Sequence, residues 1–141
     1  ENVLEKANLP TQIRKRALHV VREQERVRLF HEGLEKKASP RELGRLLTDS
    51  HNSSSELFEN SCPELDFLVQ SLVAHDQVLG ARLTGGGFGG AVLAWTTTEF
   101  QQTDADKIAS SYEKQFGHCP ETHCFSPSKG ASIEDWKQAK G

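Results

Sequence analysis

The sequence has no methionine and only three cysteines, one tyrosine and two tryptophans among its 141 residues. No apolar run approaches the ~20 residues that a membrane-spanning helix needs, and the N-terminus lacks the charged-then-apolar pattern of a signal peptide. An odd number of cysteines cannot all pair within the chain, which indicates a reducing cytoplasm. The net charge of −3 gives no electrostatic reason to expect nucleic acid or an anionic membrane as a partner.

Apolar side chains make up 35% of the residues, which is enough to form a core. We therefore expect one folded domain over residues 1–141, loosely ordered at about 1–10 and 128–141. The absence of methionine means that the initiator is missing. Trimming of one residue and excision from a longer chain both explain this, and composition does not choose between them.

The first half of the sequence has the periodicity of helices. Basic residues from Arg14 to Arg28, with Glu23 and Glu25 among them, cover one face of a long predicted helix. We interpret this face as a solvated surface of mixed charge rather than a phosphate-binding patch. Apolar residues at steps of three and four predict a buried stripe on the other face, formed by Ile13, Ala17, Val20, Val27, Phe30, Leu34 and Ala38.

Two further helix starts have nearly the same pattern. Ser39-Pro40-Arg41-Glu42 and Ser61-Cys62-Pro63-Glu64 each place a serine before a proline and a glutamate, which predicts a capping box at each start. Apolar residues at helical spacing follow both segments. The sequence thus predicts two capped helices about 20 residues apart.

The second half predicts strands at residues 78–84, 91–97 and 121–126. Between the last two we expect a helix that is capped by Thr103 and ends at Gly117. This order of elements predicts an α+β fold in which helices cover one face of an antiparallel sheet.

Five glycines in six positions separate the first two predicted strands. Because glycine loses more backbone entropy on folding than any other residue, this composition indicates positive φ angles or close contact with a ligand. Exposed N–H groups on such a loop form a concavity that binds anions. The candidate site residues are Gly85, Gly86, Gly87, Phe88, Gly89 and Gly90.

Three phosphate-binding patterns match this loop only in part. A dinucleotide-binding loop needs a helix directly after it, but the residues after Gly90 are strand-like. The loop of nucleotide hydrolases needs a lysine, which does not follow Gly90. The loop of protein kinases also lies between strands, but the accompanying lysine, H-R-D and D-F-G motifs are absent. A tightly curved hairpin without a ligand remains the structural alternative.

Five segments, in the same order over about residues 13–133, resemble the C-terminal domain of galactokinases in the GHMP kinase superfamily. The 80–90 segment, G-A-R-L-T-G-G-G-F-G-G, resembles the third signature motif of that superfamily, and S-C-P-E-L-D at 61–66 is unusually specific. The other segments are R-A-L-H-V-V at 16–21, G-R-L-L with S-H-N-S between 44 and 53, and Gly130-Ala131.

The resemblance implies a ferredoxin-like C-terminal domain whose first strand lies upstream of Glu1. It implies a kinase that transfers the γ-phosphate of ATP to the 1-hydroxyl of galactose with Mg²⁺. In the family the sugar site, the catalytic residues and the main phosphate loop belong to an N-terminal domain, whose motifs are absent from this sequence. We therefore expect an excised domain, inactive alone, with no catalytic residue and no metal ligand. ATP and Mg²⁺ would be bound mainly by the N-terminal domain, with the glycine loop near the phosphates.

The sequence departs from the family pattern at several positions. Ala91 replaces a common cysteine, Phe58-Glu59-Asn60 replaces Tyr-Glu-Val, and Lys129 replaces a common aspartate. A distant member with a related sugar substrate would show such changes. The alternative is a non-catalytic sugar and ATP sensor, or an interaction module, on the same scaffold. Loss of the N-terminal domain would expose an apolar interface, so we expect self-association.

Two other groups of residues carry less specific signals. Adjacent residues on a strand point to opposite faces, so we do not predict a zinc site from His118-Cys119 and His123-Cys124. No aspartate partner can be assigned to His51, which we interpret as structural although serines lie near it in the sequence. We assign Ser61 to capping and Cys62 to a half-buried, unreactive thiol.

Overall fold

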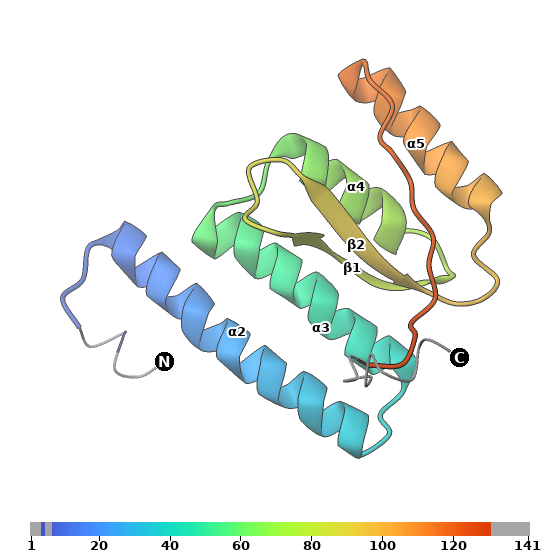
Figure 1. Cartoon of the computed structure of the whole chain (residues 1–141). Helices are drawn as coiled ribbons and strands as arrows, with labels where there is room; N and C mark the ends of the chain where they lie inside the picture. The colour runs from blue at the N-terminus through green and yellow to red at the C-terminus, as the bar shows by residue number, and fades with distance from the viewer. Residues whose placement is uncertain (1–3, 5–6, 131–141) are drawn as a thin grey trace, which may run out of the picture.

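The computed structural model describes residue 4 and residues 7–130. In these residues four α-helices, one π-helical segment and two strands follow one another, and the helix α3 lies between the helix α2 and the strands (Figure 1). The elements are α2 (Thr11–Glu35), α3 (Pro40–Ser53), η1 (Ser54–Phe58), α4 (Pro63–Val73), β1 (Val78–Thr84), β2 (Ala91–Thr96) and α5 (Gln102–Phe116). None of the helices in this described part is both long and apolar enough to cross a bilayer.

The predicted start of α3 is confirmed in detail. The Ser39 hydroxyl accepts a hydrogen bond from the Glu42 N–H, and the Glu42 carboxylate accepts one from the Ser39 N–H. Pro40 occupies the first turn, where its missing N–H leaves no bond unmade. The sequence therefore fixes this helix start through local bonds alone.

The capping box predicted at the start of α4 does not form. Cys62 is the N-cap residue and makes no side-chain capping bond. The Ser61 hydroxyl instead donates to the Asp66 carboxylate at 2.5 Å, because Asp66 is held by a buried histidine on α3.

The start of α5 also differs from the prediction. Its capping box is formed by Gln101 and Asp104 rather than by Thr103. The predicted left-handed end of this helix at Gly117 is confirmed, with φ of 80°.

The long helix α2 exists as predicted, but its apolar stripe is not buried. The face packed on α3 and η1 is largely polar: Arg16 bonds the Leu57 carbonyl, His19 bonds Ser53, and Ser50 donates to Glu23. Ala38 lies beyond the helix end. The prediction of a buried stripe is therefore wrong, since four of its members are 54–69% exposed: Ile13, Val20, Val27 and Leu34.

The sheet consists of β1 and β2, paired antiparallel with Thr84 opposite Ala91 and Gly80 opposite Trp95. The outer edge of β1 lies along α3, whose side chains accept its free donors. The Ala81 N–H bonds Thr48 Oγ1 at 3.2 Å and the Leu83 N–H bonds His51 Nδ1 at 3.3 Å. A helix thus satisfies backbone groups that a third strand would otherwise bond.

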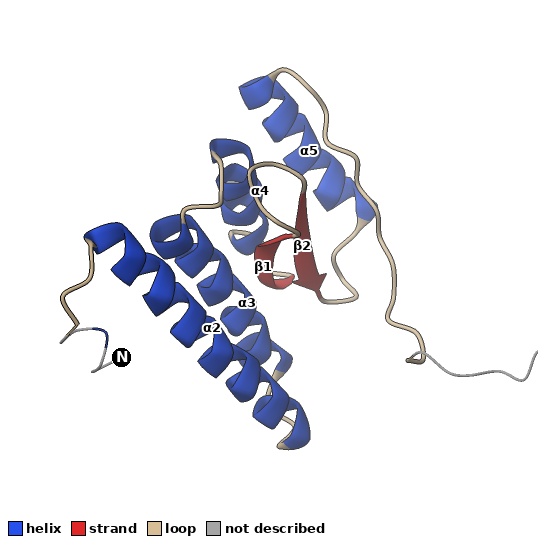
Figure 2. Ribbon diagram, turned by 60° about the vertical axis from the view of Figure 1, so that its left-hand side comes forward, coloured by secondary structure: helices blue, strands red, loops and turns tan. Residues whose placement is uncertain are grey.

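The core lies between this sheet, α3, α4 and α5, as seen in Figure 2. One face of β1 supplies Ala81 and Leu83, both almost fully buried. The helices fill the rest of the core with Leu43, Leu65, Val69, Ala105, Ala109 and Tyr112. This arrangement confirms the α+β class, with a helix-covered antiparallel sheet.

The third predicted strand, at residues 121–126, does not form. These residues have no regular structure, and all their side chains are exposed. Phe125, the largest apolar side chain of the segment, is 77% exposed, so the segment buries too little apolar surface to hold a strand in place. Of the termini expected to be loose, residues 1–3, 5, 6 and 131–141 lie outside the described residues.

Candidate phosphate-binding loop

The glycine loop connects β1 to β2 and takes a conformation that few sequences can adopt. Five of its six residues have positive φ: Gly85 (81°), Gly87 (83°), Phe88 (58°), Gly89 (120°) and Gly90 (89°). Side chains make such angles costly, so the run of glycines is explained by the backbone path. Phe88 is the exception, since a bulky residue in this region is an outlier.

The loop is open to solvent rather than folded into the core. An added Cβ at Gly85, Gly86, Gly89 or Gly90 would meet no atom within 4 Å. In the described part of the chain, no hydrogen bond uses the N–H of any of the five glycines as donor. The loop therefore presents free backbone donors, without side chains between them and an approaching anion.

One residue outside the loop holds it from below. The Phe88 N–H donates to the Asn60 carbonyl oxygen at 2.7 Å, and the Asn60 side-chain amide donates to the Gly86 carbonyl at 3.1 Å. A Cβ on Gly87 would lie 2.0 Å from the Asn60 oxygen. In the sequence Asn60 stands out only as a departure from the family pattern, a polar residue where relatives have an apolar one.

A buried histidine lies below the start of the loop, at the end of β1. His51 is 3% exposed; its Nδ1 accepts the Leu83 N–H, and its Nε2 lies 3.1 Å from Asp66 Oδ1. Asp66 also accepts hydrogen bonds from Ser55 and Ser61. The aspartate partner that sequence analysis did not assign is thus Asp66.

This cluster does not form a nucleophilic triad. The Ser61 hydroxyl bonds Asp66 and Asp66 contacts the His51 ring, but within the described residues no hydrogen bond joins the His51 imidazole to a serine hydroxyl. Burial lowers the pKa of His51 below its usual value of about 6.5, although the nearby Asp66 carboxylate opposes the shift. His51 is therefore neutral and structural, as predicted.

The histidine and cysteine pairs near the end of the described chain do not converge. His118 bonds the Tyr112 hydroxyl at 3.1 Å, while Cys124 lies near Gln102 and Cys119 near its neighbouring carbonyl. In residue 4 and residues 7–130, no three His, Cys, Asp or Glu side chains gather closely enough to hold a metal ion. The described residues therefore do not fit Mg²⁺ or zinc.

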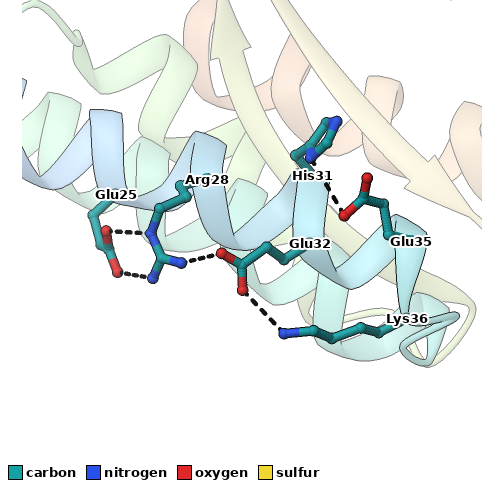
Figure 3. Close-up of polar contacts among 6 residues, drawn as sticks. All are labelled: Glu25, Arg28, His31, Glu32, Glu35 and Lys36. Carbon is teal, nitrogen blue, oxygen red and sulfur yellow. Dashed lines mark hydrogen bonds and ion pairs between the residues drawn. The ribbon is translucent and has the colours of Figure 1, made fainter.

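The charged residues of α2 pair with one another along the helix surface. Arg28 bonds both Glu25 and Glu32, and Lys36 bonds Glu32 at 3.1 Å (Figure 3). Exposed ion pairs of this kind contribute little to stability. For Glu25 and Arg28 this agrees with the predicted solvated face of mixed charge. For Arg16 and Glu23 the prediction is wrong, because their side chains bond Leu57 and Ser50 where α2 packs on η1 and α3.

Residues 30–118, which include α3, η1, α4, both strands and α5, match the family described as GHMP kinases C terminal. The chain therefore belongs to this family of kinase C-terminal domains. The glycine loop lies within the matched residues.

Within that family the chain is similar to galactokinases. It is 42% identical to the galactokinase of Thermotoga petrophila over 105 residues, which are 74% of this chain and 30% of that protein. It is 35% identical to the galactokinase of Thermococcus kodakarensis over 129 residues, or 92% of this chain and 36% of that protein. The crystal structure of Lactococcus lactis galactokinase complexed with galactose superposes with a TM-score of 0.77 at 27% identity, covering 84% of this chain and 31% of that one. The chain thus spans about a third of the length of these relatives.

Proposed function

We propose that this chain is the C-terminal domain of a galactokinase-like sugar kinase, which transfers the γ-phosphate of ATP to the 1-hydroxyl of galactose or a related sugar. The open glycine loop is the observation that carries this proposal, because its free N–H groups suit phosphoryl oxygens. Its similarity to galactokinases over most of the chain supports the choice of sugar and reaction class. A location in the reducing cytoplasm would be consistent with the three cysteines being free thiols.

The chain would contribute only part of the chemistry. Phosphoryl transfer depends mainly on positioning and on stabilising the charge of the transferred group. The loop offers backbone donors, but it has no carboxylate to act as a base or to bind a metal. ATP, Mg²⁺ and the sugar would therefore be held mainly by an N-terminal kinase domain, with the loop placed against the phosphates.

Two measurements on the 141-residue chain test this assignment. With galactose, ATP and Mg²⁺ we expect no sugar phosphate, because the chain contributes no catalytic group; ATP-dependent product would contradict this. With inorganic tripolyphosphate at millimolar concentration, we expect the amide NMR signals of residues 85–90 to shift while that of Gly130 stays in place. Equal shifts at both sites, or none, would refute a phosphate-binding loop.

A second function, as an interaction module, is favoured by the exposed apolar row of α2. Ile13, Val20, Val27 and Leu34 follow one another at intervals of seven residues, so they lie along one side of the helix. We expect the chain to self-associate through this row, since contiguous exposed apolar surface marks contact sites. Sedimentation should show association that rises with concentration and is reduced in Val27→Glu; a monomer at all concentrations would contradict it.

A further inference from the structure

The contacts beneath the glycine loop fix it at two points, on either side of its most constrained residue. Asn60 accepts from the Phe88 N–H through its backbone and donates to the Gly86 carbonyl through its side chain. Gly87 lies between these two points and has a φ of 83°. Because it has no Cβ, the carbonyl oxygen of Asn60 can lie against its backbone. The path of the loop is therefore set by one residue of another segment.

The segment that carries Asn60 is itself held by side chains of α2. The π-helical η1 ends at Phe58, and Glu59 caps it with a left-handed backbone and a φ of 58°. The Glu59 carboxylate is bonded by Lys15 at 2.9 Å and Arg16 at 2.7 Å, and these bonds lower its pKa to about 2. Such a strained turn persists only where its surroundings determine it, and here the cations of α2 do so.

The cost of burying the Asn60 side chain shows that stability is not its main contribution. Asn60 is 7% exposed, and its Oδ1 has no hydrogen-bond partner among the described residues. A buried amide oxygen without a partner is unfavourable, whereas an apolar side chain of the same size would bury without that penalty. What the amide adds is the bond to Gly86, which lies in the loop.

Phe88 shows what this hold achieves. Its φ of 58° is strained for an aromatic residue, and the residue is 79% exposed, so little packing compensates the strain. The hydrogen bond from its N–H to Asn60 is the contact that keeps this backbone in place.

We propose that Asn60 is a positioning residue of the glycine loop, which holds the free N–H groups in the arrangement that meets phosphoryl oxygens. The inference rests on the proposed phosphate-binding function of the loop. It states that Asn60 keeps that loop in one conformation. Asn60 does not contact the phosphate itself.

The test compares Asn60→Leu, which removes the amide but keeps the size and the backbone carbonyl, with Asn52→Leu at an exposed position on α3. In Asn60→Leu we expect the Phe88 amide to exchange its hydrogen roughly two- to tenfold faster, the loss expected for one hydrogen bond. The dissociation constant for tripolyphosphate should rise by a similar factor, while the urea midpoint does not fall. A merely structural asparagine would give the opposite pattern, a lower midpoint with an unchanged loop.

A second pair of variants tests the contact between Asn60 and the loop by changing residues of the loop. Gly87→Ala places a methyl group against the Asn60 oxygen, while the neighbouring Gly86→Ala has open space and no positive φ. We expect faster Phe88 exchange and weaker tripolyphosphate binding for the first variant only. Wild-type exchange in both Asn60→Leu and Gly87→Ala would overturn the positioning role. A wild-type chain whose loop ignores tripolyphosphate would refute phosphate binding alone, because the exchange measurements decide the positioning separately.

Discussion

Replacing Gly80 with alanine is expected to lower the free energy of unfolding by about 3 kcal/mol or more, which is the upper range for overpacking a core. The added Cβ would lie 1.8 Å from the carbonyl oxygen of Gly44, because α3 crosses β1 with the two backbones in direct contact. Neither atom is on a flexible side chain, so relief requires the helix and the strand to separate. Urea denaturation measures the loss.

The reciprocal change tests the same crossing from the helix. Gly44→Ala would place its Cβ 2.3 Å from the Leu79 carbonyl oxygen. In an unobstructed helix this substitution stabilises by roughly 0.5–1 kcal/mol, so a destabilised variant reverses the usual sign. Gly86→Ala, in open space, is the matched control and should stay within about 0.5 kcal/mol of wild type. A stable Gly80→Ala chain would show that the crossing is looser than described.

Removing the imidazole of His51 is expected to have the second-largest effect, a loss of about 3 kcal/mol. His51→Ala leaves the buried Leu83 N–H without its acceptor and Asp66 without its partner, and it opens a cavity. An unsatisfied buried donor alone costs about 1–3 kcal/mol. His19→Ala, at a half-buried histidine on α2, is the comparison and should cost less.

His51 also predicts the pH dependence of stability. Its Nδ1 accepts a hydrogen bond, so a second proton would have to be placed against the Leu83 N–H. Burial lowers the pKa of His51 in the folded chain from about 6.5, so the unfolded chain takes up protons first as pH falls. Stability should be full above pH ~6.5 and decline as the pH drops below that value toward the lowered pKa.

The pKa of His19 is also lowered by burial, so it contributes in the same direction. His51→Gln keeps an acceptor for Leu83 but does not titrate, and it isolates the share of His51. Unfolding free energies measured between pH 5 and pH 8 should therefore be flatter for His51→Gln than for wild type. Parallel curves for the two chains would refute the assignment to His51.

The elements that the sequence predicts best are those defined by local bonds. The capping box at Ser39 and the left-handed end at Gly117 depend on neighbours within a few residues, and both are confirmed. The prediction of which face of α2 is buried was wrong because it depends on distant contacts. Periodicity locates an apolar stripe but does not show which face the partner helix contacts. Here η1 and α3 offer polar groups, so the polar face packs inward.

The candidate site was predictable as a loop but not as an arrangement. Glycine composition alone pointed to residues 85–90 and to positive φ angles. The residues that hold the loop, Asn60 and Glu59, lie more than 20 positions away, and a single sequence does not show contacts of that range. The bond between His51 and Asp66 joins two helices and was missed for the same reason.

The two donors that α3 satisfies on β1 also limit how the sheet can grow. Since the Ala81 and Leu83 N–H groups already have side-chain acceptors, a further strand could join that side only by displacing Thr48 and His51. Any enlargement of the sheet, whether from the same polypeptide or from another molecule, is therefore directed to the far side of β2. The helix sets a direction for assembly as well as covering an edge.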